Sequence, residues 1–285
     1  MTLRRWHSHL PLLLLAWLAL PAQAAPPLPT PALLRDIRPE ATEAIGHVGS
    51  EMGAAGGLLY FRHSPAFDTS YFDLVDDEPW RSDGTPEGTF RLADIFPGRI
   101  GSGPQHFVAL GAQMLFVARD DWGEGLWKSD GTPAGTVLVR HGPPRQHLDA
   151  SGDFPSAELG GVLYFSARLD ETGAELWRTD GTPEGTRRVK DLTPGPADTR
   201  YSMLTPVGNT LFFITGEWGG PHTLWKSDGT EAGTLKVWEG APAGPEAEIR
   251  QLIAVGSTLF MVTRAEGKEQ LWRSDGTAAG TSKLV

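Results

Sequence analysis

The sequence predicts an all-β protein: a β-propeller of about five four-stranded blades, built from repeats of about 48 residues. The first observation is the motif Trp-[Lys/Arg]-[Ser/Thr]-Asp-Gly-Thr-x-x-Gly-Thr, which occurs five times between residues 80 and 281. The second is the spacing of its aspartates, 47, 50, 48 and 47 residues, which is typical of propeller blades. The third is that no stretch keeps a 3.6-residue hydrophobic period, so almost no helix is expected.

Each copy carries the same three signature residues: a tryptophan, an aspartate and a glycine. The sets are Trp80, Asp83 and Gly84; Trp127, Asp130 and Gly131; Trp177, Asp180 and Gly181; Trp225, Asp228 and Gly229; and Trp272, Asp275 and Gly276. Asp-Gly predicts a tight turn, because glycine accepts positive φ and the carboxylate can accept backbone amide hydrogen bonds. One carboxylate per turn offers too few oxygens for calcium, so we interpret the aspartates as structural.

The tryptophans alternate with polar residues along a predicted strand, which favours packing between blades as a ring of five stacked indoles. The basic residue after each tryptophan is then expected on a solvated strand face. The third copy shows the four predicted strands most clearly, at 154–159, 162–166, 174–179 and 187–192. Glycine-rich links join them, as in other blades.

Three regions are expected along the chain. Residues 1–24 are predicted to be a cleaved secretory leader, with Arg4 and Arg5 before an apolar run and Ala22-Gln23-Ala24 at the cut. Residues 25–32 form a proline-rich linker, and residues 33–285 form the repeat domain. Residues 33–37 resemble the fourth strand of a blade, so the array either closes with an extra strand or is an open piece of something larger.

Composition limits the partners and the compartment. The formal charge is −10, and loss of the two leader arginines makes it about −12. Nucleic acid is therefore an unlikely partner, since phosphate binding needs a basic face. After the leader, no apolar run approaches the length of a membrane span, so no membrane insertion is expected. The expected location is secreted, periplasmic or at the cell surface, and packing alone must hold the fold because the chain has no cysteine.

The motif resembles a known repeat. Glu175-Leu176-Trp177 and Asp180-Gly181-Thr182 match every named letter of the ELWxxDGT repeat of secreted bacterial proteins, and the similarity covers the chain from Leu33 onward. The other copies keep Trp and Asp-Gly-Thr but depart at the first two positions, as in Glu78-Pro79 and Gly125-Leu126. The resemblance implies a repeat-built β architecture and brings no established activity or catalytic residues.

Candidate ligand-binding residues lie in the links between the second and third strands, on the end opposite the signature turns. Asp121 and Trp122 occupy this link in the second copy, and Glu217 and Trp218 occupy it in the fourth. An aromatic ring beside acids is a common way to hold a sugar, and loops on a rigid scaffold commonly carry binding residues. The loops differ from copy to copy, which favours a single composite surface over one sugar site per blade.

For catalysis the sequence offers little. The six histidines after the leader share no repeat position, and no nucleophile elbow or phosphate-binding loop occurs. We therefore expect no cofactor, no metal and no enzyme activity, but a binding scaffold for an extracellular glycan or protein. One alternative is a glycan-active hydrolase or lyase, with acids such as Asp76, Asp77 and Glu78 on the loop face. Another is a structural surface module without a small ligand.

Overall fold

The computed structural model describes residues 47–64, 77–98, 101–144, 146–148, 154–217, 221–240, 248–265 and 267–285. These residues all belong to one compact unit, Leu34–Val285. The expected leader, the expected linker and the strand expected at residues 33–37 lie outside the described residues. The described residues therefore all lie in the repeat array.

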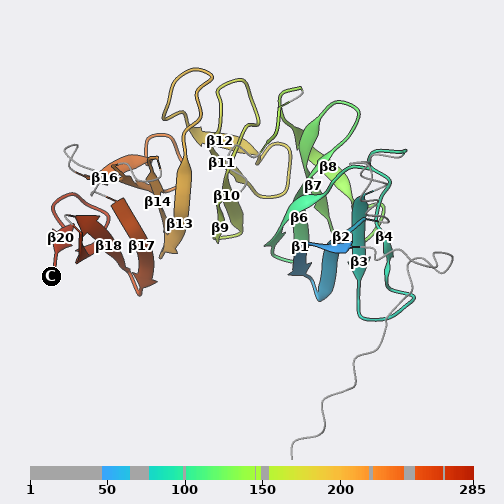
Figure 1. Ribbon diagram of the computed structural model, residues 1–285, viewed down its shortest axis with the longest axis horizontal. Coiled ribbons are helices and arrows are strands. Elements are labelled where there is room, and N and C mark those ends of the chain that lie inside the picture. The colour runs from blue at the N-terminus through green and yellow to red at the C-terminus, as the bar shows by residue number, and fades with distance from the viewer. Residues whose placement is uncertain are drawn as a thin grey trace, which may run out of the picture. The chain divides into compact units, whose positions relative to one another are not determined.

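Twenty strands form five four-stranded sheets, here called sheets 1 to 5 (Figure 1). Sheets 1 and 2 contain β1 (His47–Ala55), β2 (Leu58–Ser64), β3 (Glu78–Ser82), β4 (Phe90–Arg91), β5 (Gln105–Leu110), β6 (Gln113–Arg119), β7 (Glu124–Ser129) and β8 (Val137–His141). Sheets 3 and 4 contain β9 (Ser156–Leu159), β10 (Val162–Ala167), β11 (Glu175–Thr179), β12 (Arg187–Lys190), β13 (Tyr201–Val207), β14 (Thr210–Thr215), β15 (Thr223–Ser227) and β16 (Leu235–Glu239). Sheet 5 contains β17 (Glu248–Val255), β18 (Thr258–Ala265), β19 (Lys268–Ser274) and β20 (Ser282–Lys283).

Every sheet is an antiparallel meander with its strands in chain order. The four strands predicted in the third copy appear as β9 to β12, each within two residues of the expected bounds. The described residues contain no helix, so none that could cross a membrane. Because successive strands reverse direction, the first link and the signature turn of each sheet share one end, called here the turn end. The other links lie at the opposite end, called the loop end.

The signature turn is a closed set of hydrogen bonds that is nearly identical in all five copies. In sheet 3, Asp180 Oδ1 accepts from the backbone amide and the hydroxyl of Thr182, at 2.9 and 2.6 Å. The Thr182 hydroxyl in turn accepts from the Gly185 amide, and Thr186 donates to the Thr182 carbonyl. The Thr179 and Thr186 hydroxyls lie 2.7 Å apart beneath the turn. The motif therefore satisfies its own polar groups within eight residues.

The two glycines of the motif are required for different reasons. The first glycine has a positive φ, 85° at Gly181 and up to 90° at Gly84, where a side chain would strain the backbone. The second glycine lies against the aspartate: a Cβ at Gly185 would be 2.0 Å from Asp180 Oδ1. The same conflict recurs at Gly88, Gly135, Gly233 and Gly280. Both glycines are thus fixed by the geometry of the turn.

Successive sheets pack through two neighbouring positions of their second strands. One residue faces the next sheet and the other faces the preceding sheet, and the two meet in a buried cluster at each junction. The pairs are Tyr60 with Met114, Leu115 with Leu163, Tyr164 with Leu211, and Phe212 with Leu259. Burying one such side chain stabilises the fold by roughly 1.5–3 kcal/mol. Among the described residues, no buried hydrophobic cluster joins sheet 5 to sheet 1.

The motif tryptophans pack between sheets, but the expected ring of stacked indoles is wrong. Trp177, Trp225 and Trp272 each contact the cluster that joins their sheet to the preceding one. Among the described residues no two motif indoles stack on each other, because each pairs with the second strand of its own sheet, as Trp225 does with Phe213 at 6.4 Å. Trp177 alone of the five is fully buried, and the Arg140 guanidinium lies 5.1 Å from its ring centre.

The basic residues after the tryptophans are not the solvated face that the sequence suggested. Arg178 is half-buried, lies over Tyr164 and donates to the carbonyl of Gly229, in the signature turn of the next sheet. A Cβ at Gly229 would be 2.2 Å from the Tyr164 hydroxyl. The signature turn of sheet 4 is therefore seated on an aromatic and a basic residue of sheet 3. Arg273, in sheet 5, is exposed.

We predict that Gly185→Ala destabilises the protein by about 1–3 kcal/mol, because the new Cβ overlaps the Asp180 carboxylate. The measurement is the free energy of unfolding in urea. Removing the carboxylate with Asp180→Ala should cancel most of this penalty, so the double variant should be more stable than the sum of the two changes implies. The exposed neighbour change Glu184→Ala serves as the control. Additive effects of the two changes would contradict the overlap.

The signature aspartates also predict an acid-sensitive fold. The hydroxyl and amide of Thr182 hold the pKa of Asp180 below its usual value. A folded pKa below the unfolded value, about 3.9, adds stability above that pH and loses it as the pH falls through the folded pKa. The stability gap between the wild type and Asp180→Asn should therefore be larger at pH 6 than at pH 2.5 in urea unfolding. An equal gap at both pH values would show that the charge is irrelevant.

Candidate functional site

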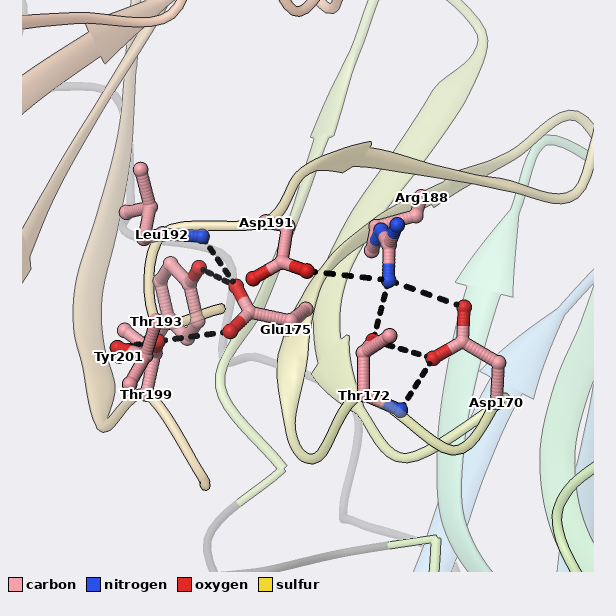
Figure 2. A network of polar contacts seen from close by, with 9 residues as sticks. All are labelled: Asp170, Thr172, Glu175, Arg188, Asp191, Leu192, Thr193, Thr199 and Tyr201. Carbon is pink, nitrogen blue, oxygen red and sulfur yellow. Dashed lines mark hydrogen bonds and ion pairs between the residues drawn. The ribbon is translucent and has the colours of Figure 1, made fainter. Parts of the chain in front are cut away.

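The loop end is held by buried side chains that accept hydrogen bonds from the link to the next sheet. Figure 2 shows the clearest case, Glu175, which is fully buried. Its carboxylate accepts from the Leu192 amide at 3.1 Å, the Thr199 hydroxyl at 2.8 Å and the Tyr201 hydroxyl at 2.6 Å. Leu192 and Thr199 lie in the link from β12 to β13, and Tyr201 begins β13. Glu175 therefore ties sheet 3 to the first strand of sheet 4.

The first four copies all carry such an anchor, although the residue changes. Glu78 accepts from the amides of Ile95 and Phe96, both at 3.0 Å, and from the Ser102 hydroxyl. In the second and fourth copies the anchor lies one residue earlier, three before the tryptophan. These anchors are Glu124, which accepts from the Leu148 amide, and His222, whose Nδ1 accepts from the Ile249 amide.

Burial raises the pKa of Glu78 and Glu175, although the hydrogen bonds that they accept lower it in part. A folded pKa above the unfolded value, about 4.3, means that the folded state binds the proton more tightly. This contribution favours folding below the unfolded value and is lost as the pH rises through the folded pKa. The anchors thus respond to pH in the opposite sense to the signature aspartates.

A second polar group stiffens the loop end of sheet 3. Arg188, on β12, contacts Asp170, Thr172 and Asp191 (Figure 2). Asp170 also accepts from the Thr172 amide at 3.0 Å, which closes the turn between β10 and β11. Opposite charges pair in this way across several loops at this end, as Arg62 does with Asp77 and Arg168 with Asp198.

The loop between β6 and β7 presents the predicted residues Asp121 and Trp122. Asp120 and Gly123 exchange backbone hydrogen bonds of 3.0 and 3.3 Å, and Asp120 Oδ1 accepts from the Trp122 amide at 2.9 Å. His141 lies 3.4 Å from the other carboxylate oxygen of Asp120. This tight turn holds Trp122 outward, with 78% of the residue exposed. Folded proteins usually bury most of an indole ring, but that of Trp122 is in contact with solvent.

Trp122 borders a cleft of about 460 Å³ between this turn and the link that leads to sheet 3. The cleft is lined by Arg119, Asp121, Trp122, Gly123, Glu124, Pro144, Gln146 and His147. One wall is thus an aromatic ring with carboxylates, and the other carries an amide and an imidazole. The Glu124 carboxylate is already engaged, because it lies 2.7 Å from His147 Nδ1 and accepts from the Leu148 amide.

The second predicted pair does not join the first. Glu217 is exposed and lies 3.6 Å from Arg200, which lines a smaller cleft of about 180 Å³ between β13 and β17. Trp218 lies outside the described residues. Asp121 and Trp122 belong to sheet 2 and Glu217 to sheet 4, with sheet 3 packed between them. Glu217 therefore lies apart from the cleft beside Trp122.

Two of the three acids considered for a hydrolase are committed to other contacts. Asp77 is buried and paired with Arg62, and Glu78 anchors the link to sheet 2. Asp76 lies outside the described residues. Within the described part of the chain, no group of three His, Asp or Glu side chains is arranged to hold a metal ion. The anchors were missed from the sequence, although a Glu or His two or three residues before the tryptophan was a visible signal.

Comparison with known proteins supports the fold. No family model matches the chain, and no curated protein sequence matches it. Among solved structures, prolyl oligopeptidase B from Galerina marginata is similar at 12% identity and a TM-score of 0.50, over 88% of this chain and 37% of that one. A puromycin hydrolase matches at 18% identity and TM-score 0.46 over 82% and 38% of the two chains. TolB from Acinetobacter baumannii matches at 13% identity and TM-score 0.38 over 73% and 49%.

This chain spans less than half the length of each of these proteins. The matched part of the prolyl oligopeptidase is its β-propeller domain, and at this identity the likeness shows the fold alone. The array of four-stranded sheets is thus propeller-like.

We predict that Glu175→Ala destabilises the protein by about 2–4 kcal/mol, because it leaves the buried Tyr201 hydroxyl and Leu192 amide without an acceptor. Urea unfolding at neutral pH measures the loss, and amide hydrogen exchange should speed up at Leu192. The control is Glu171→Ala, an exposed acid on the preceding loop, which should stay within about 0.5 kcal/mol of the wild type. If Glu175→Ala behaves like the control, Glu175 does not anchor the link.

Proposed function

We propose that the five sheets are blades of a β-propeller array that serves as a noncatalytic binding scaffold for an extracellular glycan, held in the cleft beside Trp122. Export follows from the expected leader at residues 1–24. The five repeated sheets, and their likeness to the propeller of a larger protein, support the scaffold.

The observation that carries the binding role is the exposed indole of Trp122 over a polar cleft. A folded protein usually buries a ring of this size, and an exposed one beside convergent polar groups is typical of a binding site. The Asp120 turn fixes the backbone that carries the indole, so the loop need not be reordered on binding. A preformed aromatic platform suits a flat ligand.

A sugar ring fits this chemistry. Its C–H face can pack on the indole while its hydroxyls, which both donate and accept, meet the carboxylate of Asp121 and the donors of Arg119 and Gln146. The cleft holds acids and bases side by side, and the whole chain is acidic at −10. This balance favours a neutral oligosaccharide over a sulfated or uronic acid polymer.

The same cleft argues for binding without hydrolysis. A glycosidase needs two free carboxyl groups about 5–10 Å apart, one of them able to act as an acid. Of the two carboxylates here, Glu124 is already bonded to His147 and to the Leu148 amide. Asp121 then has no second carboxylate in the cleft that is free of hydrogen-bond partners. The chain is therefore proposed to hold its ligand unchanged.

We predict that the purified protein binds neutral oligosaccharides on a glycan array and that Trp122→Ala weakens binding of the selected glycan about tenfold or more, since an aromatic contact contributes about 1.5 kcal/mol. Isothermal titration calorimetry gives the affinity, and Trp122→Phe should retain part of it. The matched control is Leu235→Ala, an exposed apolar residue at the turn end of sheet 4. Unchanged affinity in Trp122→Ala would place the site elsewhere, and cleavage of the glycan would favour the hydrolase.

A further inference from the structure

The four junctions between sheets follow one rule, which gives each sheet two different faces. The leading face packs on the preceding sheet through the second residue of the second strand and the glycine of the signature turn. The trailing face packs on the next sheet through the residue that comes next on the second strand, together with the last residues of the first strand and an apolar residue of the fourth. Leading and trailing faces are complementary at every junction.

Sheet 5 has a trailing face that no described residue covers. Leu284 of sheet 5 is 46% exposed, whereas the equivalent Leu92, Val139, Val189 and Val237 are 2–5% exposed. Val255 is 58% exposed, whereas the equivalent Ala55, Leu110 and Val207 are 6–7% exposed and the equivalent Leu159 of sheet 3 is partly buried against its junction. Ile253 is also exposed, on the same strand face. The trailing face of sheet 5 is thus an apolar surface of the kind that is buried four times elsewhere in the chain.

Sheet 1 has the matching leading face, which is likewise covered by none of the residues that the structure describes. Leu59 is 39% exposed, whereas the equivalent Met114, Leu163, Leu211 and Leu259 are at most 1% exposed. A Cβ at Gly84 would have no atom within 4 Å, whereas at the other four signature turns it would meet the preceding sheet. Met52 is exposed on this face as well. The two halves of a fifth junction are therefore both present and separate.

We propose that the trailing face of sheet 5 binds the leading face of sheet 1 of a second copy of this chain, so that copies associate head to tail. The interface continues the four junctions inside the chain: Leu59 of one copy packs against Phe260 and Val255 of the other. Arg273 then lies where Arg178 lies in sheet 3, positioned to donate to the carbonyl of Gly84 as Arg178 does to that of Gly229.

The fit to a second copy comes from the sequence of the faces themselves. Exposed apolar surface of this extent marks an interaction site, and each face retains the residue types of its half of the junction. The two faces differ from each other, so the contact is heterologous and joins unlike surfaces of two copies. A pair of copies still has one free face of each kind. Association can therefore continue beyond two copies or close into a ring.

Sedimentation velocity of the purified protein over a concentration series tests the proposal. The wild type should associate as concentration rises. Leu59→Glu and Val255→Glu should each weaken association about 100-fold or more, since each would bury an unpaired charge. Val137→Glu is the control. Val137 is 39% exposed but belongs to sheet 2, which forms neither of the two faces in the proposed contact, so this variant should associate like the wild type. Circular dichroism and urea unfolding establish that all three variants are folded.

Mixing the two defective variants gives the decisive result. Leu59→Glu retains an intact trailing face and Val255→Glu an intact leading face, so an equimolar mixture should form dimers and nothing larger. Failure of the mixture to dimerise would overturn the head-to-tail contact. A wild type that stays monomeric at every concentration would also overturn it. If, in that case, both variants were less stable than the wild type in urea, the two faces would meet within one chain.

Discussion

The carboxylate that folds back within each signature turn determines the geometry on which the array depends. It occupies the space beside the second glycine and accepts both donors of the following threonine, so the chain reverses without leaving a polar group unsatisfied. In sheets 2 to 5 the reversal presents the first glycine to the preceding sheet, where a Cβ would lie 2.2–3.2 Å from the nearest atom. The hydrogen bonds of the turn and the packing between sheets therefore require the same set of residues. This explains why Asp, Gly, Thr and the second Gly recur together at a fixed spacing.

At the loop end the links are held in a less uniform way. Each of the first four sheets extends an acceptor to the link or to the first strand that comes after it. Two use a glutamate two residues before the tryptophan, and two use a residue three before it. The two positions reach different amides. The glutamates bond the amides of Ile95 and Leu192, soon after the fourth strand. Glu124 and His222 bond those of Leu148 and Ile249, which lie closer to or within the next sheet. Each buried acceptor nevertheless satisfies a backbone amide. The loops are thus anchored although their sequences vary. A surface built from such loops can change its residues while the fold is kept.

Much of the fold could be predicted from the sequence because it depends on local patterns. Repeat spacing and glycine placement predicted the strands of the third copy, and Asp-Gly predicted the turn. Partners across sheets could not be predicted in this way. Arg178 was expected in solvent because alternation places it opposite the tryptophan, but that face is covered by the next sheet. For the same reason the role of Glu175 was not apparent: its three donors lie 17 to 26 residues further along the chain. The sequence predicted that Asp121 and Trp122 lie on a loop. It could not predict that they lie apart from Glu217.

The candidate cleft and the anchor meet at one residue in the second copy. Glu124 both holds the Leu148 amide of the link and borders the cleft beside Trp122. Because its other oxygen lies against the exposed ring of His147, a ligand that displaced this histidine would also alter the anchor. A ligand that bound without moving His147 would instead contact a surface already fixed by sheet packing. Binding that leaves the Glu124–His147 contact intact has the smaller cost in free energy, because these side chains are already ordered in the folded protein. Rigidity at the loop end and the proposed recognition beside Trp122 would therefore have a common physical origin.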